Sequence, residues 1–202
     1  AVGSLHNSGS ITAVDEVELK AQQDLENTRN IISQKDHVLI DAKGNLNNSG
    51  DIKAYDFVDL DSWLLLRNTG NIISDNSGVT LQATVGVNNG TAIHNEGNVT
   101  AKEQILLTSY KGDVTNYGSM TSTNSSVSLT AAGVYETEDN NNFTIVNNIT
   151  NTGSITAAQE VLLRTVNGSI DNQNQITSQN STVTIKAEKH STYTGNEAVG
   201  NI

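Results

Sequence analysis

The sequence has 202 residues, no Cys, no Pro and a formal net charge of −11 at pH 7. Without Cys there is no disulfide framework, and the acidic balance disfavours nucleic acid and anionic lipid as partners, because both select basic surfaces. No apolar run approaches the ~18–20 residues of a membrane-spanning helix. The first residues have neither the basic start nor the apolar stretch of a signal peptide. We therefore expect residues 1–202 to be one segment of a longer chain, beginning at the end of an earlier repeat.

One pattern recurs eight times along the chain. Each copy begins with an apolar residue, a spacer and an Asn, first at residues 5–7. A buried side-chain amide is costly unless it is paired. Stacked Asn side chains can hydrogen-bond to one another and cap the adjoining turn, so we predict a structural Asn column. Its members are Asn7, Asn27, Asn48, Asn68, Asn95, Asn116, Asn151 and Asn172.

A turn is predicted immediately after each of these Asn residues. Gly stands two positions after the Asn in six copies, and Arg29 and Asn174 replace it in the other two. Gly with an occasional Asn is typical of a left-handed backbone position. We therefore expect positive φ in this turn and some strain at Arg29. The six turn glycines are Gly9, Gly50, Gly70, Gly97, Gly118 and Gly153.

Two further segments complete each copy, first at residues 11–13 and 17–21. Both alternate apolar or small residues with polar spacers, and this period of two predicts strands. Such short strands bury little surface alone, but coils stacked ~4.8 Å apart bury their inward residues in columns. We predict an all-β fold, a right-handed parallel β-helix of about eight coils of 20–21 residues. Leucine-rich and left-handed hexapeptide solenoids fit the spacing less well.

Successive copies alternate at the corner before the last strand. Odd copies have Ala followed by a three-residue corner, as after Ala54, whereas even copies have Ser followed by a four-residue corner, as after Ser74. The repeat unit is therefore two coils. A Ser hydroxyl can hydrogen-bond to nearby backbone groups, so we expect it to bond into the longer corner.

Three longer connections interrupt the copies, at residues 82–92, 130–148 and 186–201. Each follows an even coil, so all three should leave the rod at one corner, and insertions of this kind often carry function in solenoids. Their aromatic, acidic and Asn side chains suit carbohydrate. The alternative interpretation is tolerated loops whose aromatic residues fold back on the rod. The candidate ligand-binding ridge consists of Tyr135, Glu136, Asp139, Phe143 and Tyr193.

A second cluster lies in the third copy, where Tyr55, Phe57 and Trp63 accompany Asp56, Asp59 and Asp61. Asp59 and Asp61 alternate with inward apolar residues, so they should point outward. A metal or sugar site is compatible with these residue types. The preferred interpretation is a solvated acidic strand with surface aromatic residues.

The repeat resembles a known family of bacterial exoproteins. Apolar-x-Asn-x-Gly-x-Ile-x-Ala/Ser followed by Val-x-Leu-x-Ala, across residues 1–187, is similar to the haemagglutinin repeats of the filamentous haemagglutinin family. This family of two-partner secretion exoproteins includes adhesins and the filaments of contact-dependent growth-inhibition toxins. The resemblance implies export through the outer-membrane transporter of that pathway, a rod-like β-helix and a location on the bacterial cell surface.

We therefore expect a structural or adhesive segment of a secreted surface filament, with a glycan or protein of a host or bacterial cell as partner. The receptor-binding or stalk portion of a growth-inhibition toxin stays open as an alternative, as does, more remotely, a polysaccharide-acting enzyme. Such enzymes need carboxylates clustered with basic residues on adjacent coils. Because Arg29, Arg67 and Arg164 are spread along the chain, we expect no enzyme and no catalytic residue. The four His residues are isolated from one another, and we expect no metal and no cofactor.

Overall fold

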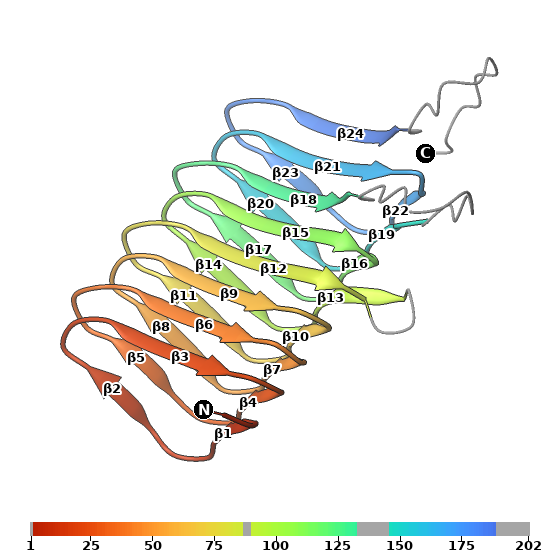
Figure 1. Cartoon of the computed structure of the whole chain (residues 1–202). Coiled ribbons are helices and arrows are strands. Elements are labelled where there is room, and N and C mark those ends of the chain that lie inside the picture. Colours follow the sequence, from red (N-terminus) through yellow and green to blue (C-terminus); the bar gives the residue numbers. More distant parts are fainter. Residues whose placement is uncertain (1, 87–89, 133–145, 189–202) are drawn as a thin grey trace, which may run out of the picture.

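Three parallel strands per coil wind into a β-solenoid in the computed structural model, which describes residues 2–86, 90–132 and 146–188 (Figure 1). The strands stack in chain order into three eight-stranded parallel sheets, here called A, B and C. The prediction of an all-β parallel β-helix of about eight coils is confirmed. The described residues include no helix that is long and apolar enough to cross a membrane.

Sheet A holds the first strand of every coil. Its strands pair residue for residue, so that Leu5 lies opposite Leu25 and Asn7 opposite Asn27. Because side chains alternate between the two faces of a strand, the apolar residue and the Asn point inward and the spacer points outward. The strands are β1 (Leu5–Asn7), β4 (Leu25–Asn27), β7 (Leu46–Asn48), β10 (Leu66–Asn68), β13 (Thr91–Asn95), β16 (Asp113–Asn116), β19 (Ile149–Asn151) and β22 (Ile170–Asn172).

Sheet B follows the turn after the Asn column. Its inward positions hold an apolar residue and then Ala or Ser, as where Ile52 and Ala54 pair with Ile72 and Ser74. The strands are β2 (Ile11–Ala13), β5 (Ile31–Ser33), β8 (Asp51–Ala54), β11 (Asn71–Ser74), β14 (Asn98–Ala101), β17 (Ser119–Ser122), β20 (Ser154–Ala157) and β23 (Ile176–Ser178).

Sheet C contains the longest strands. Its inward positions hold two large aliphatic residues and then a small one, as where Val58, Leu60 and Ser62 pair with Val79, Leu81 and Ala83. The strands are β3 (Val17–Ala21), β6 (Val38–Ala42), β9 (Val58–Ser62), β12 (Val79–Val85), β15 (Ile105–Lys111), β18 (Val127–Ala131), β21 (Val161–Val166) and β24 (Val183–Glu188).

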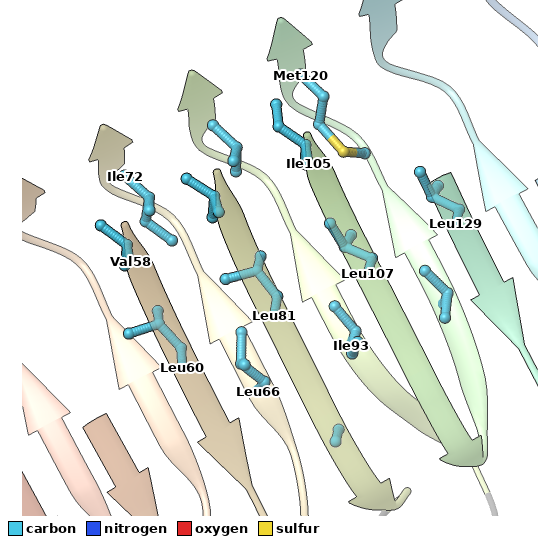
Figure 2. Packing of buried hydrophobic residues seen from close by; sticks show 14 of the residues in the cluster. Val58, Leu60, Leu66, Ile72, Leu81, Ile93, Ile105, Leu107, Met120 and Leu129 are labelled. Carbon is cyan, nitrogen blue, oxygen red and sulfur yellow. The ribbon is translucent and has the colours of Figure 1, made fainter. Parts of the chain in front are cut away.

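Columns of similar apolar side chains fill the space between the sheets (Figure 2). One column consists of Leu60, Leu81, Leu107 and Leu129, which lie on successive strands of sheet C and are each 0 % exposed. Burial of one such side chain contributes about 1.5–3 kcal/mol. A single coil cannot bury these residues without neighbours above and below it. The hydrophobic core is therefore a property of the stack.

The Asn side chains of sheet A form an unbroken hydrogen-bonded ladder from the first coil to the eighth. At each step the Nδ2 of one Asn donates to the Oδ1 of the Asn in the next coil, at 2.7–2.8 Å. Asn95 Nδ2 also donates to Gly97 O of its own turn, at 3.1 Å. Asn95 and Asn116 are fully buried. The ladder thus supplies partners to amides that would otherwise be costly to bury, and it aligns successive coils.

The predicted left-handed turn after each Asn is wrong. Among the described residues, φ is positive only at Gly112 and Asn167, and neither belongs to the glycine column. Arg29 and Asn174 therefore adopt ordinary backbone conformations, and the strain expected at Arg29 does not follow. The glycines at this turn need another explanation.

Close approach between successive coils accounts for the glycine column. A Cβ atom built on Gly118 would overlap the carbonyl oxygen of Gly97 in the preceding coil. Gly9, in the first coil, has no heavy atom within 4 Å of the same position. At Gly118 a side chain is thus excluded by the neighbouring backbone rather than by the local dihedral angle, whereas Arg29 and Asn174 occupy the same place in the turns of their own coils. The same overlap with the preceding coil occurs at Gly50, Gly70, Gly97 and Gly153.

The two-coil repeat has a structural basis in the Ser of every even coil. Ser74 Oγ donates to Asp56 O of the preceding odd corner at 2.5 Å and accepts the N–H of Ser77 in its own corner at 3.1 Å. An Ala could make neither bond. The hydroxyl therefore joins a four-residue corner to a three-residue one, as expected. Equivalent pairs of bonds are made by Ser33, Ser122 and Ser178.

Two of the three long connections begin as extensions of sheet C. Strand β12 continues to Val85, which lies opposite Lys111 of β15. Strand β24 continues to Glu188, which lies opposite Val166 of β21. Residues 82–85 and 186–188 are therefore strand residues within the ranges expected as insertions.

Candidate functional site

The corner between sheets B and C places one residue of each coil in a column on the outside of the rod. Each residue directly precedes a sheet C strand, and from the second coil onward its carbonyl accepts an N–H from the preceding coil. Val38 N–H donates to Phe57 O, and Val58 N–H donates to Gly78 O, both at 3.1 Å. In chain order this corner column is Glu16, His37, Phe57, Gly78, Gln104, Ser126, Glu160 and Thr182.

Two rings stack within the corner column. The ring centroids of His37 and Phe57 are 4.6 Å apart and the ring planes are inclined by 9°, which matches the ~4.8 Å spacing of coils. His37 Nδ1 lies 2.6 Å from Asp36 Oδ1, and its Nε2 lies 3.5 Å from Glu16 Oε2. Carboxylates at both ring nitrogens hold the imidazole in place. One face of the Phe57 ring is therefore covered by His37.

The column has no side chain at its next position, because that residue is Gly78. A Cβ atom on Gly78 would lie 2.6 Å from the carbonyl oxygen of Gln104, closer than real side chains come. The backbone of the next coil thus restricts this position to Gly. The result is an open groove of about 270 Å³ beside Phe57. Its lining residues are Phe57, Asp59, Ser77, Gly78, Thr80, Glu103, Gln104 and Leu106.

The groove has an unbalanced acidic character. Its lining includes the carboxylates of Asp59 and Glu103 and no basic side chain. Burial raises the pKa of Asp59, and the charge of Asp61 raises it further. A carboxyl group that loses hydrating water without gaining a nearby positive charge has a raised pKa. The groove therefore presents negative charge that is partly desolvated.

The strand beside the groove contains a second perturbed carboxyl group. The pKa of Asp61 is raised by burial and by the charge of Asp41, while Lys43 opposes the shift. The Oδ1 atom of Asp61 is buried and has no hydrogen-bond partner. Burial of a polar atom without a hydrogen-bond partner costs folding free energy. Asp59 and Asp61 are half-buried, which differs from the solvated acidic strand expected from the sequence.

The sequence-predicted sites have different outcomes. Of the coil-three cluster, Phe57 and Asp59 line the groove, whereas Tyr55 and Trp63 are 50 % and 53 % exposed and lie outside its lining. Sequence reasoning missed Gly78, although a Gly at a corner where other coils have a side chain was a usable signal. The candidate ridge lies outside the described residues, namely Tyr135, Glu136, Asp139, Phe143 and Tyr193.

The side chains of the groove suit binding. The lining residues carry an aromatic ring, two carboxylates, an amide and two hydroxyl groups, and polar groups beside an apolar surface of this kind can hold a ligand. In the described ranges, no three His, Asp or Glu residues are grouped so that they could hold a metal ion.

Comparison of the chain with protein-family models, with curated proteins and with solved structures gave no match.

Proposed function

We propose that this chain is a structural and adhesive segment of a filament that a bacterium secretes and displays on its surface. The observation that carries the proposal is the unbroken stack, in which three sheets and the Asn ladder continue through eight coils. A solenoid gains length by adding coils, without any new kind of contact. At ~4.8 Å per coil, eight coils extend roughly 40 Å. The likeness of the repeat to those of filamentous haemagglutinins supports the same role.

The outward faces favour attachment to other cell-surface molecules. The outward row of sheet A includes Glu26, Asn47, Arg67 and His94 in register on successive strands. Polar groups in such a row can bond glycans or proteins while keeping the rod hydrated. Under this proposal the parent chain leaves the cell through a two-partner secretion transporter, and its partner is a glycan or protein on a host or bacterial cell.

Deleting whole coils tests the structural part of the proposal. Removal of residues 25–65 takes out one two-coil unit and leaves an odd coil followed by an even coil. We expect this variant to keep its circular dichroism spectrum and to be roughly 10 Å shorter by small-angle X-ray scattering. Removal of residues 46–65 alone is the matched control, because it places two even corners together and leaves Ser74 opposite a longer corner. If both deletions unfold the chain equally, coils are not modular.

Binding to cells tests the adhesive part. The labelled chain is measured by flow cytometry on panels of bacterial and animal cells. We expect saturable binding to at least one cell type, competed by unlabelled chain. Binding confined to bacteria would favour the growth-inhibition filament. If the folded chain binds no cell, the adhesive role is refuted. The remaining role would be that of a spacer within the filament.

A further inference from the structure

The groove beside Gly78 has the features of a site for one particular chemical group. We propose that it binds the guanidinium group of an arginine side chain on a partner protein. The inference deepens the proposed attachment role and depends on it for its biological meaning. The chemistry of the groove can be tested separately.

The aromatic wall provides the first argument. Phe57 has one face stacked on His37, and its other face points along the corner column toward the position where Gly78 leaves no side chain. A group at that position lies about one coil spacing, ~4.8 Å, from the ring. Cations are attracted to an aromatic face within ~6 Å of its centroid, and the flat guanidinium group stacks on such a face.

The polar lining provides the second argument. Asp59 on β9 and Glu103 in the corner before β15 both contribute to the same groove. A guanidinium group carries five N–H donors in one plane and pairs with carboxylates through two parallel bonds. The side-chain oxygen of Gln104 can accept a remaining N–H. The lining residues therefore carry two carboxylates and an amide oxygen that can accept hydrogen bonds from an arginine head.

Charge complementarity identifies the occupant as a cation. The groove has two carboxylates and no basic residue in its lining, and the whole chain carries a net charge of −11. Such a field raises the rate of encounter with basic partners. The raised pKa of Asp59, caused first by burial and then by Asp61, indicates a carboxylate that a neighbouring cation would stabilise.

Other occupants match the lining less well. A neutral sugar could use the hydroxyl and amide groups, but it would leave both carboxylates without a counter-charge. A phosphate would be repelled by them. A lysine ammonium would satisfy the charge, yet it is a compact, strongly hydrated ion that cannot stack flat on Phe57. Arginine uses the ring and both carboxylates together.

Nuclear magnetic resonance titration of the ¹⁵N-labelled 202-residue chain tests the proposal. The probe is Nα-acetyl-arginine methylamide, with the citrulline analogue as neutral isostere, the lysine analogue and methyl glucoside. We expect the arginine probe to shift the amides of Gly78, Thr80 and Gln104 saturably, with a Kd of about 1–10 mM for a single side chain. The citrulline analogue should bind at least about tenfold more weakly.

Three variants locate the binding energy. The double variant Asp59→Asn/Glu103→Gln should weaken the arginine probe at least about tenfold, and Phe57→Leu should weaken it about fivefold. The matched control is Glu160→Gln, which removes a carboxylate from the same corner column outside the groove lining. It should change the Kd by less than about twofold. Unchanged amide spectra away from the groove establish that each variant is folded.

Several results would overturn the inference. Equal binding of the arginine and citrulline probes would show that charge is irrelevant. An equal loss with Glu160→Gln would indicate diffuse attraction to an acidic surface. Saturable shifts at Gly78 with methyl glucoside, and none with the arginine probe, would make the groove a saccharide site. If the arginine probe fails while the chain still binds cells, this inference is wrong and the proposed attachment function stands.

Discussion

Replacing Asn95 by Ala would interrupt the buried Asn ladder near its middle. The variant loses the bond from Asn68 Nδ2 to Asn95 Oδ1 and the bond from Asn95 Nδ2 to Asn116 Oδ1, both 2.8 Å long. It also loses the 3.1 Å bond to Gly97 O. Asn68 keeps its own-coil bond to Gly70 O. The Oδ1 of Asn116, which is fully buried, loses its ladder donor.

The expected destabilisation is about 3–5 kcal/mol. Each buried hydrogen bond contributes about 0.5–1.5 kcal/mol net, and an acceptor left unsatisfied in the interior costs about 1–3 kcal/mol. Asn172→Ala is the matched control at the last rung. It removes the 2.7 Å ladder bond from Asn151, but Asn172 is exposed. Water can replace the lost partner there, so the expected cost is about 1 kcal/mol.

Urea unfolding followed by far-ultraviolet circular dichroism measures the two costs. Because stacked repeats can unfold in parts, native-state hydrogen exchange of the amides in strands β10, β13 and β16 is recorded alongside. We expect protection to fall mainly in these strands for Asn95→Ala. If Asn95→Ala costs no more than Asn172→Ala, the ladder does not stabilise the rod and the argument from buried amides is wrong.

Further substitutions test the other columns by the same unfolding assay. Gly118→Ala should cost about 1–3 kcal/mol, because its Cβ needs the coils to separate, whereas Gly9→Ala should be nearly neutral. Ser74→Ala should cost about 1–3 kcal/mol, because a corner N–H loses its acceptor; a neutral result would refute the bridging role. Burial and Asp41 raise the pKa of Asp61, so the folded state holds the proton more tightly than the unfolded state. The stability gained on protonation is fully present below the ordinary pKa of 3.8 and is lost as pH rises through the folded value. Asp61→Asn should therefore raise the unfolding midpoint at pH 7, with the difference vanishing near pH 3.

The coil architecture could be predicted because it depends on periods within each copy. Alternation at residues 17–21 and its seven counterparts identified strands, and the constant distance to each Asn identified coils. The pairing of Asn7 with Asn27 follows from the same repeat. Register in such a stack is dictated by the inward apolar residues, since a shift by one residue would expose them.

Only part of the candidate site could be predicted from the sequence. Phe57 and Asp59 stand out within the third copy, but Glu103 and Gln104 come from the fifth, and nothing in their local sequence marks them. The contacts that build the groove run along the rod axis, between residues far apart in the chain. Its central feature is a missing side chain at Gly78, which acquires meaning only beside its neighbours in the column.

By itself, the sequence determined that the chain forms stacked parallel coils, which residues point inward and where an Asn column runs, because each depends on a spacing that repeats along the chain. Only the tertiary structure decided why Gly stands two residues after the Asn in coils such as the sixth, where the closeness of Gly97 to Gly118 excludes a side chain and no left-handed backbone is involved. It also decided that Asp59 and Asp61 are half-buried and that a groove opens beside Phe57. The physical reason is that these properties depend on the distance between coils, which is set by packing in three dimensions.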